Sequence, residues 1–115
     1  MRKIVLSVAL VFVSTAAMSQ SAAPAGDAKA GLAAFNSYGC YTCHGIIGQG
    51  TLRDGPHLNA AAIGYPALLA QLRTPRYEMP AYTEVQISDR TVADIYAYLT
   101  TLPKAPDPKS IGALK

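Results

Sequence analysis

Both cysteines of the chain and one of its two histidines lie within five consecutive positions, at Cys40, Cys43 and His44. Such a cluster could form a disulfide, a redox dithiol, a zinc site or an anchor for haem. A disulfide would close a very small loop and remove little entropy from the unfolded chain. A thioredoxin-like dithiol normally opens a helix that follows a strand, and no strand is predicted before Cys40.

Zinc would need a fourth ligand, for which His57 is available. Cys43 and His44 are adjacent, however, and the paired-ligand spacing of zinc modules is absent. The pattern Cys-x-x-Cys-His is instead the attachment motif of c-type haem. On a helical turn, Cys40 and Cys43 share one face, and His44 follows Cys40 by four residues on the same side. We therefore expect two thioether bonds to haem and an axial imidazole from His44.

The first nineteen residues have the layout of a secretory signal peptide. Arg2 and Lys3 precede an apolar run over residues 4–13, and small residues follow it. The run is too short for a stable transmembrane helix, although an uncleaved anchor is the alternative. We predict cleavage after Ser19, or else after Ala23, and a periplasmic location. This location agrees with the motif, because such haems are attached outside the cytoplasm.

Length and charge exclude several classes of function. The predicted mature chain has about 95 residues, the size of one small domain. The whole chain has ten Lys and Arg against seven Asp and Glu, and loss of Arg2 and Lys3 leaves eight against seven. No basic cluster suited to nucleic acid remains, and no other segment could span a membrane. We therefore expect neither nucleic-acid binding nor stable membrane insertion of the mature chain.

A helix is predicted directly before the cysteine motif. Asp27 is a suitable N-cap for it. Residues at three- and four-residue spacing give the helix one face, which contains Ala28, Gly31, Leu32 and Phe35. Gly31 lowers helix propensity, so another backbone should approach closely at that position.

Two further helices and long loops follow the motif. Residues 45–64 are glycine-rich and predict a loop, whereas residues 65–74 predict a helix with proline in its first turn. Residues 75–87 carry two prolines and are irregular. Ser88 is the N-cap of a last helix that stops before Pro103. No strand pair is predicted, and long loops of this kind usually carry function.

The domain organisation follows from these elements. We predict an all-α domain over residues 27–103, a flexible leader over residues 20–26, and a proline-rich, extended C-terminal tail over residues 104–115.

These stretches together resemble the small mono-haem class I cytochromes c over about residues 27–103. The resemblance rests on GLAAF before the motif, CYTCH itself, GPHL and MPAY after it, and the final VADIYAYLTTL. It implies the class I cytochrome c fold, in which three to four helices and long loops wrap around one covalently attached haem c. It also implies one-electron transfer rather than catalysis.

Met79 is the candidate for the second axial ligand, and it is the only methionine left in the predicted mature chain. Pro80 favours an extended backbone at Met79, and a thioether ligand raises the reduction potential relative to two histidines. MPAY resembles the Met-Pro-x-aromatic ligand loop of the family. The alternatives are that Met79 fills a gap in the core, or that His57 is the ligand.

The resemblance also implies partners for the haem and its histidine. In the family, the proline carbonyl of G-P-x-L accepts a hydrogen bond from the proximal histidine, and Pro56 matches that proline, with Leu58 packing on the haem.

The candidates for the two propionates are Arg53, Arg73, Arg76, Tyr65, Tyr77 and Tyr82. Surface solvation is the alternative for each arginine. Further candidates for the haem wall are Phe35, Leu68, Leu72, Tyr98 and Leu99, for which helix packing is the alternative. Counting the propionates, the holo-protein has a net charge near −1.

With both axial positions filled, iron offers no open site, and single electrons would pass to redox protein partners such as a periplasmic dehydrogenase or oxidase. Tyr41, Ile46 and Ile47 form the candidate docking rim. A soluble shuttle is the first possibility. The second is a dedicated haem subunit or private acceptor of one oxidoreductase, for example a molybdenum enzyme such as sulfite dehydrogenase. Ile111 and Leu114 in the tail mildly favour the second. A haem enzyme or gas sensor with an open iron site is a third.

Overall fold

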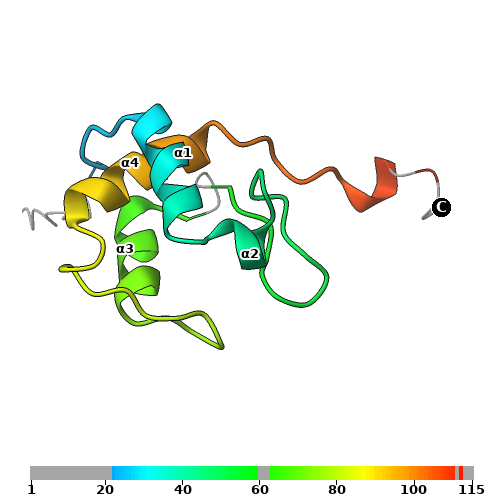
Figure 1. The fold of residues 1–115 in the computed structure, drawn as a ribbon. Coiled ribbons are helices and arrows are strands. Elements are labelled where there is room, and N and C mark those ends of the chain that lie inside the picture. The colour runs from blue at the N-terminus through cyan, green and yellow to red at the C-terminus, as the bar shows by residue number, and fades with distance from the viewer. Residues whose placement is uncertain (1–21, 60–62, 111, 113–115) are drawn as a thin grey trace, which may run out of the picture.

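The computed structural model describes residues 22–59, 63–110 and 112 of the chain. The predicted signal peptide lies outside these residues, as do Ile111 and Leu114. The described part contains helices and loops but no strand, which confirms the all-α prediction. The elements in chain order are α1 (Ala28–Ser37), α2 (Tyr41–His44), α3 (Tyr65–Arg73), α4 (Asp89–Thr100) and the 3-10 turn η2 (Pro108–Ser110) (Figure 1).

Helices α1 and α4 begin where their capping residues predict. The Asp27 carboxylate accepts hydrogen bonds from the backbone N–H groups of Lys29 and Ala30, at 2.8 and 2.9 Å. The Ser88 hydroxyl accepts one from the N–H of Thr91 at 3.2 Å. These bonds satisfy donors that have no partner within the helix, and so they fix the first residues of α1 and α4.

The first and last long helices cross each other at Gly31 (Figure 1). A Cβ atom at Gly31 would overlap the carbonyl oxygen of Asp94, so only glycine permits this approach. One turn later, the rings of Phe35 and Tyr98 pack at 5.4 Å between centroids. The close approach predicted at Gly31 is therefore confirmed, and α4 is its partner.

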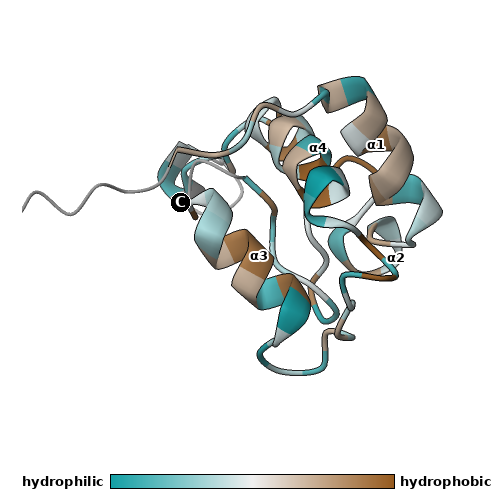
Figure 2. Ribbon diagram, turned by 90° about the vertical axis from the view of Figure 1, so that its left-hand side faces the viewer, coloured by the Kyte–Doolittle hydropathy of each residue, from teal (hydrophilic) through white to brown (hydrophobic). Residues whose placement is uncertain are grey.

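One hydrophobic core lies between α1, α3 and α4. In Figure 2 the brown, apolar side of α3 faces the other helices. The buried residues are Phe35, Tyr65, Leu68, Leu72, Ile87, Val92, Ala93, Ile95, Tyr98 and Leu99. All five candidates for the haem wall belong to this list. In the described structure, their burial comes from helix packing.

The C-terminal tail differs from its prediction in one place. Asp107 accepts hydrogen bonds from the backbone N–H of Lys109 on its side chain and from that of Ser110 on its carbonyl, at 2.9 and 2.8 Å. Aspartate commonly forms such local turns, and here they produce η2 in a segment expected to be extended. The tail runs away from the helical domain (Figure 1). Among the described residues, no helix has the length and apolar character needed to cross a membrane.

Candidate haem site

The cysteine motif forms a helical turn held against the end of α1. The Cys40 N–H donates to the Phe35 carbonyl, and the His44 N–H donates to the Cys40 carbonyl, both at 3.0 Å. The Thr42 hydroxyl donates to the Gly39 carbonyl at 2.6 Å. The helical turn predicted for the motif is confirmed, and it directs Cys40 and His44 to the same side of α2.

The imidazole of His44 is oriented by a backbone carbonyl. Its Nδ1 lies 2.9 Å from the carbonyl oxygen of Pro56. A carbonyl can only accept, so Nδ1 must carry the proton and donate it. In the neutral imidazole, the other ring nitrogen, Nε2, then has a lone pair for a metal. Fixing the second nitrogen in this way is how proteins orient ligating histidines.

Gly55 allows the loop after the motif to reach His44. A Cβ atom at this position would lie 2.9 Å from Nδ1 of His44 and 2.8 Å from the carbonyl oxygen of Cys43. The Gly50 N–H donates to the His44 carbonyl at 2.7 Å and further binds the loop to α2. Sequence reasoning assigned no role to Gly55. Its position directly before the proline of GPHL was the available signal.

The two cysteines are free thiols in a half-buried environment. Burial raises the pKa of the Cys40 thiol above its ordinary value. Neither cysteine is used by a disulfide. Within residues 22–59 and 63–110, no group of three His, Cys, Asp or Glu side chains is arranged to hold a metal. His57, the remaining candidate for a zinc ligand, follows Pro56 in the loop that holds His44.

Met79 lies at the edge of the core on a different segment from His44. Four of the predicted site residues are half-buried and pack against the core cluster, namely Cys40, Leu58, Met79 and Tyr82. The sulfur of Met79 accepts a hydrogen bond from Nε2 of Gln71 at 3.6 Å. A sulfur that meets a polar donor differs from one that only fills an apolar gap. Sequence reasoning missed Gln71, although its spacing from Leu68 and Leu72 places it beside the apolar face of α3.

Tyr82 connects the Met79 segment to the cysteine motif. Its N–H donates to the Leu72 carbonyl at 2.8 Å, and its hydroxyl donates to the Tyr38 carbonyl at 3.3 Å. The pKa of Tyr82 is raised, first by burial and then by the negative charge of Cys40 and Cys43 as thiolates. The structure thus brings the segment after Met79 to the motif.

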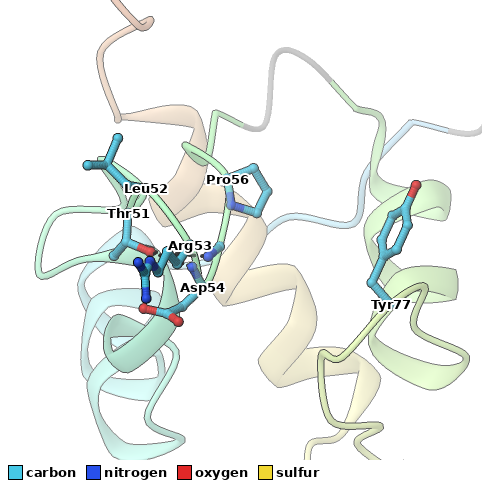
Figure 3. A pocket seen from close by; sticks show the side chains of 7 residues that line it. Thr51, Leu52, Arg53, Asp54, Pro56 and Tyr77 are labelled. Atoms are coloured by element: carbon cyan, nitrogen blue, oxygen red, sulfur yellow. Dashed lines mark hydrogen bonds between the residues drawn. The ribbon is translucent and has the colours of Figure 1, made fainter.

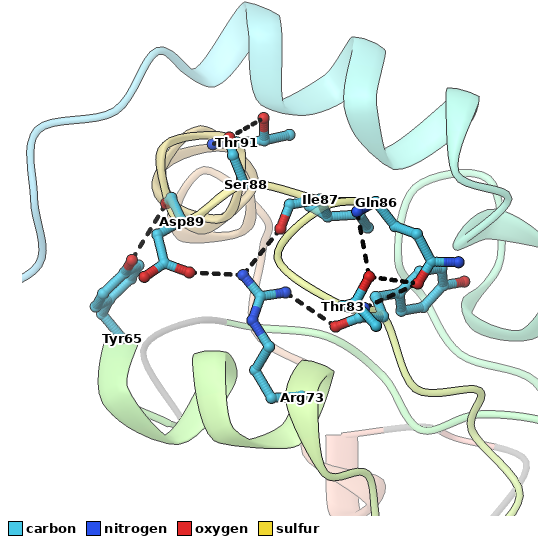
Figure 4. A network of polar contacts seen from close by, with 9 residues as sticks. Tyr65, Arg73, Thr83, Gln86, Ile87, Ser88, Asp89 and Thr91 are labelled. Carbon is cyan, nitrogen blue, oxygen red and sulfur yellow. Dashed lines mark hydrogen bonds and ion pairs between the residues drawn. The ribbon is translucent and has the colours of Figure 1, made fainter.

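Arg73 donates hydrogen bonds to protein acceptors that were not predicted from the amino-acid sequence. Nη1 donates to the carbonyl of Tyr82 at 3.0 Å, while Nη2 donates to the carbonyl of Ile87 at 2.8 Å and to the carboxylate of Asp89 at 2.6 Å (Figure 4). The hydroxyl of Tyr65 donates to the Asp89 carbonyl at 3.2 Å. These contacts join α3 to the start of α4, and the expectation that Arg73 and Tyr65 serve the propionates stays a prediction.

Other candidates for the propionates meet at an open cavity of about 320 Å³. Arg53 and Pro56 line one side of it, and Tyr77 lies across from them (Figure 3). Tyr77 is 98% exposed and has a φ of 63°, an unusual conformation for a residue other than glycine. Arg76 is exposed, and its backbone N–H donates to Gln71. The structure therefore groups Arg53 with Tyr77 and separates Arg73 from this pair.

The residues present fit a haem attached through the motif. The Pro56 carbonyl engages Nδ1 of His44 and not Nε2, the two thiols are free, and a second segment brings the sulfur of Met79 to the edge of the same core. The glycine at position 55 supplies the space that the proximal loop needs.

Comparison with known proteins agrees with this fit. Residues 26–99 match the family model described as cytochrome c oxidase, cbb3-type, subunit III. Searches of curated proteins and of solved structures gave no match. The matched range contains the cysteine motif, the Pro56 loop, Met79 and nearly all of α4. The chain belongs to this family of class I mono-haem c-type cytochromes, whose members transfer electrons by means of haem.

Proposed function

We propose that this protein carries single electrons outside the cytoplasm through one haem c. In this proposal Cys40 and Cys43 form the two thioether bonds, and His44 and Met79 are the axial ligands. The hydrogen bond from Nδ1 of His44 to the Pro56 carbonyl, at 2.9 Å, is the observation that carries the proposal. It leaves Nε2 available on the same helical turn as the two free thiols.

The second ligand is supported by the surroundings of Met79. Its segment meets the motif through Tyr82, and its sulfur lies at the edge of the core rather than inside it. A thioether is a soft ligand that suits haem iron and raises its potential. With Met79 bound, no axial position would remain for substrate, which supports electron transfer over catalysis or gas sensing.

The protein groups have separate tasks in this proposal. When bound, haem c supplies a one-electron Fe(III)/Fe(II) couple. The Pro56 carbonyl would hold His44 through Nδ1, the ring nitrogen not used for iron, and Gln71 would hold Met79 through a hydrogen bond to the sulfur itself. Leu58 and Tyr82 exclude water from the buried side. Arg53 and Tyr77 at the open cavity, together with Arg76, are our candidates for binding the propionates.

An uncharged surface beside the motif is our candidate for partner docking. Tyr41, Ile46 and Ile47 are exposed by 42%, 73% and 58%, respectively. The sequence from Tyr38 to Leu52 contains no Lys, Arg, Asp or Glu. Small apolar surfaces of this kind suit short-lived redox contacts, in which partners must separate quickly.

The predicted export and domain limits enter this proposal as well. A cleaved segment over residues 1–19 would deliver the chain to the periplasm, where haem is attached. The proposed domain starts near residue 27, after a leader over residues 20–26, and a tail over residues 104–115 follows it. The family match begins at residue 26, and the Asp27 N–H donates to the Asp94 carboxylate at 2.7 Å, which supports a start close to Asp27.

A dedicated haem subunit of one oxidoreductase is the second candidate function. The matched family model is described as an oxidase subunit, which favours an oxidase over a dehydrogenase as the partner. Purification from the native host separates this candidate from a free shuttle. Co-elution with an enzyme indicates a subunit, whereas a single haem protein eluting alone indicates a shuttle.

The axial ligands are tested by absorption spectroscopy of the oxidised holo-protein. The wild type should show the weak sulfur-to-iron charge-transfer band of a Met-ligated ferric haem. Met79→Ala should lose that band and bind carbon monoxide when reduced. A wild type without the band, or a Met79→Ala variant that retains it, would overturn the assignment of Met79.

A further inference from the structure

Gln71 is the residue of α3 that touches the proposed sixth ligand. It is half-buried and lies beside Leu72 on the helix. Its Nε2 is 3.6 Å from the sulfur of Met79, and its Oε1 is 3.4 Å from the backbone nitrogen of Arg76. One amide therefore binds both the ligand and the loop that leads to it.

The two contacts determine which way the amide of Gln71 points. The Arg76 N–H can only donate, so it must meet the oxygen of the amide. A thioether sulfur can only accept, so it must meet the NH2 group. Each contact alone requires the same orientation. Rotating the amide by half a turn would set donor against donor at one end and acceptor against acceptor at the other.

We propose that Gln71 is a positioning residue for the sulfur of Met79, an inference that rests on the proposed function. The sulfur of a thioether has two lone pairs. The Nε2–H of Gln71 holds one of them, which leaves the other for iron. The amide thereby selects the lone pair that faces the haem, and it restrains the side chain from turning away.

The same hydrogen bond affects the electronic character of the ligand. A donor on one lone pair draws electron density from sulfur and makes it a weaker electron donor toward iron. Electron donation from sulfur stabilises ferric iron more than ferrous iron. A weaker donor therefore destabilises the ferric state more, and so the hydrogen bond raises the reduction potential. Binding at the sulfur is distinct from anchoring the loop, which Arg73 and the Leu72 carbonyl accomplish at Tyr82.

Two substitutions separate the sulfur contact from the loop contact. Gln71→Leu removes both hydrogen bonds without adding charge. Gln71→Glu keeps an oxygen for the Arg76 N–H, but an ionised carboxylate cannot donate to sulfur at about pH 7. Gln86→Leu is the matched control, because Gln86 is an exposed glutamine of the same connection whose Oε1 accepts from the Thr83 N–H at 2.8 Å.

The measurements on the holo-proteins are the reduction potential, the sulfur-to-iron band and the affinity of the ferric form for added imidazole. Gln71→Leu and Gln71→Glu should both lower the potential and alter the band. Imidazole should displace Met79 roughly threefold to tenfold more readily in both, the range expected from one lost hydrogen bond. Gln86→Leu should match the wild type in all three measurements.

Other results would overturn the proposal in recognisable ways. If both Gln71 variants match the wild type while the wild type shows its band, Gln71 has no role at the sulfur, and Met79 remains the ligand. If Gln71→Leu differs from the wild type but Gln71→Glu does not, the contact with Arg76 is responsible. If the wild type itself lacks the band, the proposed function fails together with this inference.

Discussion

The guanidinium of Arg73 lies 2.6 Å from the carboxylate of Asp89 and joins the last residue of α3 to the first residue of α4. The same guanidinium donates to the carbonyl groups of Tyr82 and Ile87. The segment between α3 and α4, residues 74–88, carries Met79. Arg73 holds the end of this connection against α3, the helix that also carries Gln71. This connection is long and largely exposed, so its end needs such an anchor.

We predict that Arg73→Leu lowers the free energy of unfolding of the holo-protein by about 2–3 kcal/mol, because two carbonyl groups and a carboxylate lose a donor. Asp89→Asn should cost about 0–1 kcal/mol, since Asp89 is 53% exposed and asparagine still accepts. Urea unfolding measures both values. Equal losses in the two variants would show that the ion pair, rather than the carbonyl contacts, dominates.

We predict that Gly55→Ala destabilises the holo-protein by about 1–3 kcal/mol, because the added methyl would press on the Cys43 carbonyl and the His44 ring. The bond between His44 and the Pro56 carbonyl should weaken as the loop moves away. Thermal unfolding and the NMR shift of the His44 Nδ1 proton measure these effects.

Gly112→Ala is the control for that experiment, because an added Cβ at Gly112 would meet open space. It should leave stability and the His44 proton unchanged. If Gly55→Ala behaves like the control, the close approach of the loop to His44 is not required.

We predict a contribution to stability from Asp27 that disappears in acid. The N–H groups of Ala30 and Lys29 bind its carboxylate and lower its pKa below the ordinary value of 3.8. A lowered folded-state pKa means that the stabilisation is fully present above the unfolded-state value and is lost as pH falls through the folded-state value. The wild type should therefore lose its Asp27 contribution below about pH 4.

Asp27→Asn separates this effect from other acid transitions, because asparagine caps helices but does not titrate in this range. Urea midpoints of the two proteins, measured from neutral pH downward, should diverge only in acid, where the wild type weakens more steeply. Parallel curves over the whole range would contradict a lowered pKa at Asp27.

Much of the fold could be predicted because its determinants are local. Asp27 and Ser88 mark helix starts, and each then accepts the expected backbone hydrogen bonds. The low helix propensity of Gly31 indicated a close packing partner, which α4 provides. The haem-attachment motif could also be predicted, because it is defined by the spacing of Cys40, Cys43 and His44. The contact between His44 and the Pro56 carbonyl could be predicted from the family resemblance.

The remaining contacts depend on how distant segments face one another. Arg73 could reach many acceptors, and nothing in its local sequence favours the carbonyl groups of Tyr82 and Ile87 over a propionate. Gln71 finds Met79 only because the connection turns back along α3. Long polar side chains thus acquired partners that residue spacing alone does not specify.

The central claim is tested most directly by the mass of the mature protein isolated from the periplasm of cells with an intact haem-ligation system. We expect a coloured chain whose denatured mass exceeds that of the polypeptide by one haem, and whose haem is lost when Cys40 and Cys43 are both replaced by alanine. A colourless chain with the mass of the polypeptide alone would contradict the account.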